Sequence, residues 1–270
     1  MIRNLSELYQ YRALLVALSM RELKARYRAS VLGFLWTFLN PTLSMFVYWL
    51  VFEVVMVRSG GGMKAFPFFI FSGLLPWIFF SSSVMAGTTS VSDRRDLLTK
   101  VRFPAQVLPA TVVLTNFINM MLSVPLLVGL GLVFGIVPSW HLVLILPVLI
   151  VQVFFTLAVT YLLAALNVAF RDLQHIVASV VQLAFFLTPV LWELKILPAL
   201  FGLSQPDSIA LVSAINPMAP IVEAWHAIFY NQQPPTDWPA LGIVAVEALV
   251  IMLFSTWVFE RRREEFAELV

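Results

Sequence analysis

The chain has 270 residues, of which 60% are hydrophobic and only 12% are charged, and its net charge is +2. Soluble domains carry about a quarter of their residues as charged side chains, so this composition excludes an ordinary soluble globule. The absence of cysteine excludes disulfides, thiolate catalysis and cysteine-ligated metals.

Residues 4–28 are predicted to form an amphipathic helix. Asn4 and Glu7 have the spacing of a capping box, and apolar residues recur at intervals of three and four, at Leu8, Tyr11, Leu15 and Leu18. A helix with one apolar face lies in the plane of the membrane interface and does not cross the bilayer. The alternative is a cytoplasmic helix packed on the rest of the protein.

A cluster of cations ends this helix, directly before a long apolar run: Arg21, Lys24, Arg26 and Arg28. Such a cluster at the foot of a membrane span holds that end on the cytoplasmic side. It also attracts the anionic headgroups of lipids.

Six membrane spans are predicted, and the fold class is therefore an all-α integral membrane protein. Each span is apolar over the roughly 20 residues that a helix needs to cross a bilayer. The chain divides into a cytoplasmic interface helix (1–30), one six-span domain (31–260) and a cytoplasmic tail (261–270), which together form a single transmembrane domain over 1–270. The spans are 34–57, 66–86, 107–137, 140–170, 176–194 and 239–259.

The third and fourth spans are unusually long. Each measures about 47 Å at 1.5 Å per residue, against about 30 Å for the hydrocarbon core of a bilayer. They must tilt, kink at Pro125 or Pro147, or project out of the membrane.

The distribution of lysine and arginine predicts the orientation. Of the 17 residues of these two types, all but Arg58, Lys64 and Lys195 fall on one side of the predicted membrane. Cytoplasmic loops carry such an excess. We therefore expect both termini in the cytoplasm.

The connection 92–104 on the cytoplasmic side is predicted to contain a short helix. Ser92 can cap it, acidic residues suit its positive N-terminal end, and basic residues suit its C-terminal end before Pro104. Leu97 and Val101 share one face, which favours contact with a soluble partner. The alternative is a solvated loop that only satisfies the charge bias.

The segment 193–238 lies outside the membrane in this topology. Residues 217–230 within it are apolar enough to enter the bilayer but too short to cross it. We therefore expect an outward re-entrant helical hairpin between the fifth and sixth spans, which is allowed where its backbone is buried in protein.

No motif for catalysis or nucleotide binding is present. The chain lacks a P-loop, zinc-protease spacing and a Gly-x-Ser-x-Gly elbow. Glu223 and His226 form one Glu-x-x-His, whereas a di-iron bundle needs that motif twice with two further carboxylates. We expect neither enzymatic activity nor a cofactor or metal in this chain.

Aromatic residues concentrate in the first span and recur in the fifth. Flat apolar rings pack well on the CH-rich faces of sugars, so some of these side chains can line a passage for carbohydrate. Contact with lipid is the alternative for most of them. The candidates are Phe46, Tyr48 and Trp49 in the first span, and Phe185 and Phe186 in the fifth.

Six motifs in order resemble those of the membrane subunit of polysaccharide ABC exporters, the type-2 ABC permeases that export O-antigen, capsule or teichoic acid. The resemblance covers the chain from about residue 10 onward. The motifs are Arg-Glu-Leu-Lys-Ala-Arg-Tyr-Arg (21–28), Leu-Gly-Phe-Leu-Trp (32–36), Phe-Pro-Phe-Phe-Ile-Phe-Ser-Gly-Leu-Leu-Pro-Trp (66–77), Lys-Val-Arg-Phe-Pro (100–104), Asn-Val-Ala-Phe-Arg-Asp-Leu-Gln-His (167–175) and Asn-Pro-Met-Ala (216–219).

The resemblance implies a homodimer in the bacterial inner membrane with two copies of a separate ATPase subunit, which would bind ATP and magnesium. It implies a polysaccharide substrate carried on a polyprenyl diphosphate lipid, with no nucleic acid partner. The low charge of the predicted passage favours a near-neutral glycan, and O-antigen first among the three polymers.

The resemblance also implies roles for the segments described above. The cations at 21–28 would lie near the lipid diphosphate. A gate or coupling helix would involve Asp93, Arg94, Arg95, Asp96, Leu97, Val101 and Phe103, and a second ATPase contact would involve Arg171, Asp172 and His175. A polymer too long for one alternating-access swing would need a continuous passage lined by the first and fifth spans.

Two other classes of function remain open at this point. An ion-coupled secondary transporter would need paired charges inside the membrane and usually internal repeats. An intramembrane enzyme acting on lipid-linked sugars would need clustered carboxylates or a nucleophile beside a base. The sequence shows none of these features.

Overall fold

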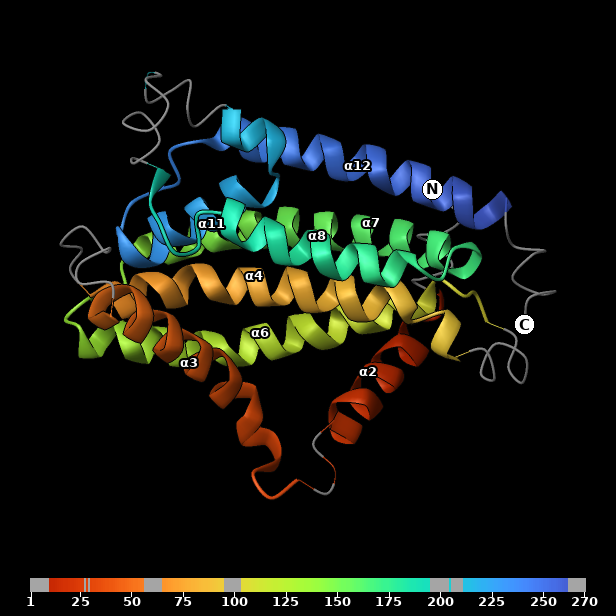
Figure 1. The fold of residues 1–270 in the computed structure, drawn as a ribbon, viewed down its shortest axis with the longest axis horizontal. Helices are drawn as coiled ribbons and strands as arrows, with labels where there is room; N and C mark the ends of the chain where they lie inside the picture. The colour runs from red at the N-terminus through yellow and green to blue at the C-terminus, as the bar shows by residue number, and fades with distance from the viewer. Residues whose placement is uncertain are drawn as a thin grey trace.

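The computed structural model describes residues 10–26, 28, 30–55, 65–94, 103–194, 204 and 211–261. Within these ranges the chain is helical and contains no strand (Figure 1). The elements are α2 (Arg12–Arg26), η1 (Gly33–Leu35), α3 (Trp36–Trp49), a π-helical turn η2 (Leu50–Val55), α4 (Phe66–Thr89), η3 (Ser92–Arg94), α6 (Val107–Val133), η4 (Trp140–Leu144), α7 (Ile145–Ala169), α8 (Leu173–Leu187), α11 (Met218–Trp225), a π-helical turn η6 (His226–Tyr230) and α12 (Trp238–Arg261).

Five helices of the described chain are long and apolar enough to cross a membrane. They are Gly33–Glu53, Phe66–Thr89, Val107–Val133, Trp140–Ala169 and Trp238–Arg261. They correspond to five of the six predicted spans. The third was drawn too long, because α6 ends at Val133, where Gly135 takes a positive φ of 76° and the backbone N–H of Ile136 donates to the carbonyl of Gly131.

The fifth predicted span, 176–194, was misplaced. Its helix α8 begins at Leu173 and ends at Leu187, so its 15 residues reach about 22 Å. Thr188 leaves the helix with extended backbone (φ −89°, ψ 138°) because Pro189 follows it. The apolar residues after this proline gave the segment the appearance of a full-length span.

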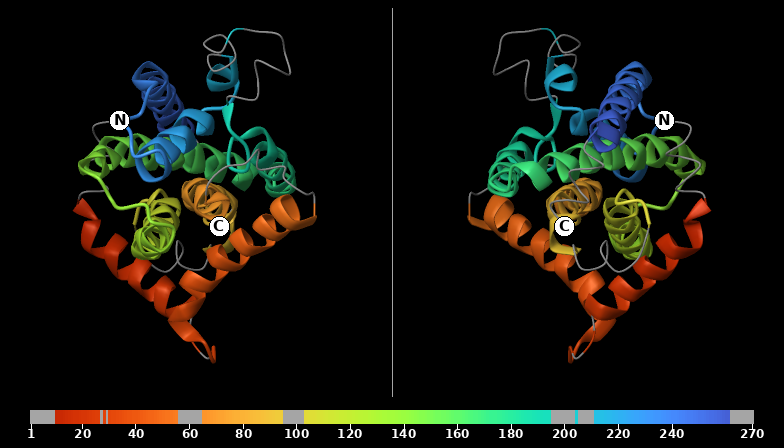
Figure 2. Two further views of the ribbon diagram at one scale, coloured as in Figure 1. Left: turned by 90° about the vertical axis from the view of Figure 1, so that its left-hand side faces the viewer. Right: turned by 90° about the vertical axis from the view of Figure 1, so that its right-hand side faces the viewer.

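Helix α4 lies at the centre of the bundle (Figure 2), and 83% of its most apolar window is buried. Helices α3, α6, α7, α8 and α11 all pack against it, and α12 packs on the far side of α7. Gly87 of α4 lies against α7, because an added Cβ atom there would come within 2.1 Å of Thr160 Cγ2. Only a glycine allows the two helices to cross at this separation.

Helix α2 packs on α6 rather than standing free. The Ser19 hydroxyl is fully buried and donates to the carbonyl of Thr111 at 3.3 Å. Tyr11, Leu15 and Leu18 of the predicted apolar face are half-buried, while Val16 and Met20 are about half exposed. Leu8 lies outside the described residues. The N-terminal helix is therefore present, and part of its apolar face is covered by protein.

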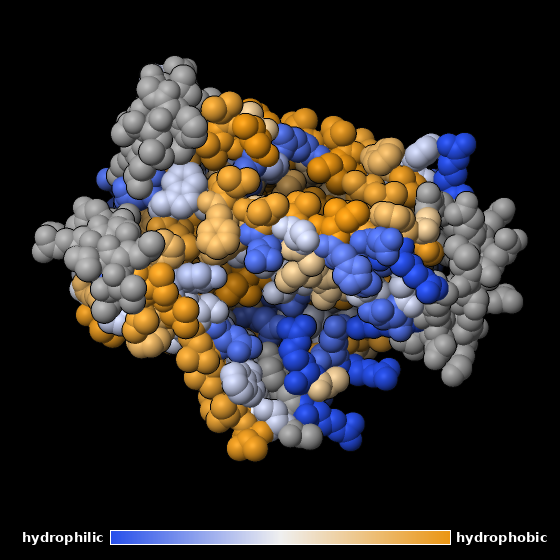
Figure 3. Space-filling model, viewed as in Figure 1, coloured by the Kyte–Doolittle hydropathy of each residue, from blue (hydrophilic) through white to orange (hydrophobic). Residues whose placement is uncertain are grey.

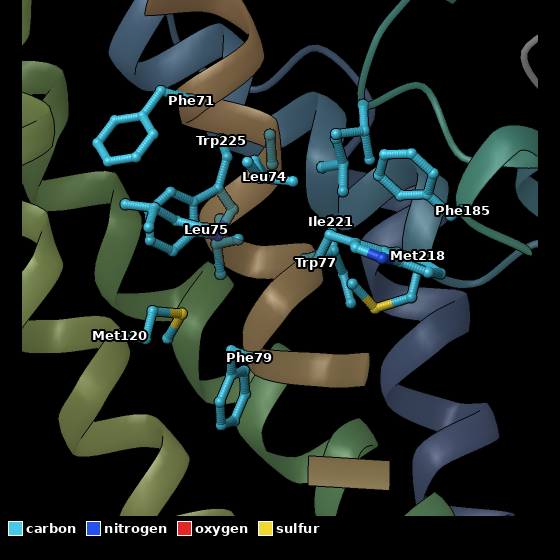
Figure 4. Close-up of a cluster of buried hydrophobic side chains, with 14 of the residues drawn as sticks. Phe71, Leu74, Leu75, Trp77, Phe79, Met120, Phe185, Met218, Ile221 and Trp225 are labelled. Carbon is cyan, nitrogen blue, oxygen red and sulfur yellow. The ribbon is translucent and has the colours of Figure 1, made fainter. Parts of the chain in front are cut away.

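Helix α11 is enclosed by the bundle, and every one of its residues except Glu223 is buried. Gln152 of α7 holds it in place, because its Nε2 donates to the carbonyl of Pro76 in α4 at 3.1 Å and its Oε1 accepts from Trp225 Nε1 at 3.0 Å. Figure 4 shows Ile221 and Trp225 among aromatic and aliphatic side chains of α4. One buried amide thus joins three helices.

Replacing Gln152 with leucine should lower the free energy of unfolding by about 1–3 kcal/mol, because Trp225 Nε1 and the Pro76 carbonyl would both lose a partner in an apolar interior. Thermal unfolding of the purified permease measures the change. The matched control is Gln174→Leu, since Gln174 is exposed on α8. Equal unfolding temperatures for the two variants would contradict the assignment.

Gly87→Ala should destabilise the protein by about 1–3 kcal/mol, because the added methyl group would overlap Thr160. Thr160→Ser removes the overlapping methyl group and should restore most of the loss. Gly129→Ala is the matched control, since nothing lies within 4 Å of the corresponding Cβ position. If the double variant is no more stable than Gly87→Ala alone, the close crossing is not the cause.

Candidate functional site

A polar cavity of about 460 Å³ lies between α2, α3, α4 and α6. Figure 3 shows hydrophilic residues gathered in the wedge between α2 and α3, whereas the visible edge of α3 that faces away from α2 is mostly hydrophobic. The polar side chains that line the cavity come from four separate helices: Arg26, Thr37, Asn40, Ser44, Ser82, Asn116, Asn119 and Ser123. So many amides and hydroxyls beside membrane-length helices mark a functional site.

Arg26 joins this cavity to the cation cluster. Its guanidinium nitrogens donate to Asn116 Oδ1 at 3.4 and 3.5 Å, and Asn116 Nδ2 donates to Ser83 Oγ at 3.3 Å. Asn116 is only 4% exposed, while Arg26 itself is exposed. These hydrogen bonds link Arg26 of α2 through Asn116 of α6 to Ser83 of α4. Arg26 also lines the cavity, so its positive charge lies at the cavity wall.

The other cations of the cluster occupy different positions. Arg21, Lys24 and Arg28 are exposed and do not line this cavity. Two other lining residues join α6 to α3, because Ser123 Oγ donates to the Thr37 carbonyl at 3.3 Å. Among the four predicted residues, Arg26 is thus the one that the fold brings to a cavity.

Sequence reasoning missed the amides of this cavity. Asn40, Asn116 and Asn119 lie inside predicted spans, where polar side chains are costly and therefore informative. Each is a single amide within an apolar span, which is a weaker sign of function than a charged or aromatic cluster. Asn40 and Asn119 lie on α3 and α6, which are separated along the chain by α4.

The first predicted ATPase contact is described in part. Asp93 is exposed in η3, Arg94 is half-buried in the same turn, and Phe103 is half-buried. Arg95, Asp96, Leu97 and Val101 lie outside the described residues. The predicted helix over 93–103 therefore stays a prediction, apart from a single 3-10 turn at its start.

The second predicted ATPase contact lies beside the first. Arg171, Asp172 and His175 are exposed at the start of α8. Asn167, just before them at the end of α7, donates through Nδ2 to Ser92 Oγ of η3 at 3.3 Å. The fold thus brings both segments to the same end of the bundle.

An ion pair links this end of the bundle to α2. Arg94 Nη2 lies 2.9 Å from Glu22 Oε2, and the two side chains are 27% and 21% exposed. Glu22 is on the same helix as the cation cluster. The segment that follows α4 is therefore connected to the helix that carries Arg26.

The predicted passage aromatics divide between two environments. Tyr48 of α3 and Phe185 of α8 lie with ring centroids 5.3 Å apart, and Phe185 also contacts Trp77 of α4 at 5.7 Å. Phe46 and Trp49 contact one another at 5.7 Å. Phe46 is 48% exposed and Phe186 is 60% exposed, while Phe185 is buried. The fold brings the first and fifth predicted spans together through Tyr48 and Phe185.

Comparison with known proteins agrees with the motifs. Residues 13–230 match the family described as ABC-2 type transporter. The O-antigen export system permease protein RfbA of Myxococcus xanthus is 54% identical over 268 residues, which are 99% of each chain. A protein of the same name from Klebsiella pneumoniae is 27% identical over 258 residues, or 95% of each chain.

A shorter match extends to another named transporter. The polysialic acid transport protein KpsM of Escherichia coli is 35% identical over 66 residues, which are 24% of this chain and 25% of KpsM. The family match covers most of the chain and confirms the resemblance that its motifs carry. The chain belongs to the membrane-subunit family of ABC-2 type transporters.

Proposed function

We propose that this chain is the membrane subunit of an ATP-driven exporter that moves a polyprenyl-diphosphate-linked polysaccharide, O-antigen in the first place, from the cytoplasm across the inner membrane. The name of the relative that is 54% identical over 99% of each chain supports O-antigen. Capsular polysaccharide is the second candidate, supported by the shorter match to KpsM.

The observation that carries this proposal is the cavity that Arg26 lines together with the amides and hydroxyls of α3, α4 and α6. A lipid diphosphate presents two anionic groups at the membrane surface, followed by hydroxyl-rich sugars. A guanidinium suits the first part because it forms charge-assisted hydrogen bonds with phosphate oxygens. The amides and hydroxyls of the cavity suit the second part, since they both donate to and accept from sugar hydroxyls.

The topology that we propose has six spans and both termini in the cytoplasm. Helix α8 would be the fifth span, with 188–194 completing the path to the outer surface. The helix α11 would be part of a re-entrant hairpin, which its burial against α4 and α7 supports. The N-terminal helix α2 would lie at the cytoplasmic interface, with its exposed Val16 and Met20 toward lipid headgroups.

We further propose that the permease works as a homodimer with two separate ATPase subunits. Only 11% of the first span's most apolar window is buried within one chain, which leaves α3 available to a second copy. The passage would then run between the copies, with Tyr48 and Phe185 near its wall. The ATPase would contact η3 and the start of α8, the two neighbouring segments at the cytoplasmic end.

Arg26→Ala should weaken binding of a polyprenyl diphosphate several-fold, because it removes the cavity-lining guanidinium that would form charge-assisted hydrogen bonds with phosphate oxygens. Lys24→Ala is the matched variant on the same helix and should have a smaller effect, since Lys24 does not line the cavity. Binding to the permease in nanodiscs and O-antigen at the surface of complemented cells are the two measurements. Equal effects of the two variants would assign the cluster to general lipid attraction instead.

Reversing one charge of the Glu22–Arg94 pair should uncouple ATP hydrolysis from export without unfolding the protein. A partly exposed ion pair contributes at most about 1 kcal/mol, so the fold survives its loss. Glu22→Arg or Arg94→Glu alone places like charges together. The double reversal restores attraction and should recover export per ATP hydrolysed in proteoliposomes. If the double variant performs no better than the single ones, the contact does not transmit force.

A further inference from the structure

A second cavity, of about 320 Å³, lies at the end of α4 that is opposite to Thr89 and η3. It is bounded by α4 through Phe69, by α11 and η6, by the residues after α8 and by the loop that leads to α12. The export function proposed above assigns no role to this cavity. Its polar lining residues are Glu193, Ser213, Glu223, His226, Asn231, Gln233, Thr236 and Asp237.

Two buried polar side chains line this cavity without a hydrogen-bond partner in the described structure. His226 is 1% exposed, and neither Nδ1 nor Nε2 is bonded. Ser213 is 8% exposed, and its Oγ is likewise unpaired. Buried polar groups are nearly always hydrogen-bonded. Because Nε2 lies against Gly73 of α4, His226 Nδ1 and Ser213 Oγ are the two unpaired atoms that point to a polar ligand in this cavity.

The position of His226 is set by its neighbours on α4. Its ring stacks on Phe69 with centroids 4.0 Å apart and an interplanar angle of 25°. A Cβ atom on Gly73 would come within 2.5 Å of Nε2, so the glycine makes room for the ring. The imidazole is thus held rigidly at the cavity wall, which is what a recognition group requires.

The charges around the cavity restrict the kind of ligand. Glu193, Glu223 and Asp237 contribute carboxylates, and no lysine or arginine is among the described lining residues. A phosphate or a uronic acid would therefore find no cation among the described lining residues. The described histidine and acidic side chains form no group of three or more that could hold a metal ion.

The remaining chemistry suits a neutral ligand rich in hydroxyl groups. Carboxylates accept from hydroxyls, the amides of Asn231 and Gln233 both donate and accept, and Phe69, Pro234 and Pro235 supply apolar surface for C–H faces. The volume falls near the lower end of the range for small-molecule sites, which is about 300–1,000 Å³. A pyranose ring combines these polar and apolar requirements.

We propose that this cavity binds a neutral pyranose unit of the glycan on the outward side of the permease. The proposal rests on the function proposed above for the identity of the glycan and for the orientation. It adds a second sugar contact at the opposite end of α4 from the Arg26 cavity, formed within a single copy of the chain.

The test is saturation-transfer NMR of the full-length permease in nanodiscs, with methyl pyranosides of neutral sugars and with methyl glucuronide as the anionic probe. Neutral pyranosides should bind, and the glucuronide should bind at least tenfold more weakly. Ser213→Ala should weaken binding of the neutral sugars about fivefold, because one hydrogen bond is lost. His226→Phe keeps the ring but removes both nitrogens, and should weaken binding further.

Ser255→Ala is the matched control, since Ser255 is fully buried in α12 and lines neither cavity. If His226→Phe does not fold, Ser213→Ala decides the question. Absence of neutral sugar binding, equal binding of the glucuronide, or unchanged binding by Ser213→Ala would each overturn the proposal. None of these results depends on export, so loss of the outer site leaves the proposed function standing. If the chain binds neutral sugars but does not support export, the proposed export function is refuted and the sugar site stands.

Discussion

The burial of α4 is the constraint on which the rest of the structure depends. Five helices pack around it, and 83% of its most apolar window is out of contact with the surroundings. A polar group on such a helix must find its partner within the protein, because lipid offers none. For the Pro76 carbonyl of α4 this partner is Gln152 of α7, which also accepts a hydrogen bond from Trp225 of α11. The same packing demands small residues at crossings, which Gly87 supplies against Thr160.

Both cavities have a wall on this central helix. The cavity that contains Arg26, called the inner cavity here, contacts α4 from Leu75 to Ser82. The cavity that contains His226, called the outer cavity, contacts α4 at Phe69. The two differ in charge: the inner cavity carries Arg26, whereas the outer one is lined by carboxylates and an unpaired imidazole. In the function proposed above, Arg26 would meet the diphosphate of a carrier lipid and the second cavity would bind a neutral sugar. Because α4 is held on all sides, one rigid element sets the walls of both cavities.

The sequence predicted a span well where the apolar run and the helix begin and end at nearly the same residues. The helices Phe66–Thr89, Trp140–Ala169 and Trp238–Arg261 lie within a few residues of their predicted ranges. The predicted helix of the fifth span extends too far, because hydropathy continues past Pro189 although the backbone leaves the helix at Thr188. Of the predicted cation cluster, Arg26 lines the cavity between α2, α3, α4 and α6, whereas Arg21, Lys24 and Arg28 do not. The amides opposite it were overlooked, since each is a single polar residue within an apolar run.

By itself, the sequence determined that the chain is a helical membrane protein, where its spans lie and which family it belongs to. These properties follow from transfer of each segment from water to lipid and from short motifs, both of which are local along the chain. Only the tertiary structure decided that Arg26 meets Asn116, that Glu22 meets Arg94 and that His226 stacks on Phe69. These contacts join residues from different helices. They depend on how each helix is rotated and where it crosses its neighbours, and side-chain packing sets those quantities across the whole bundle.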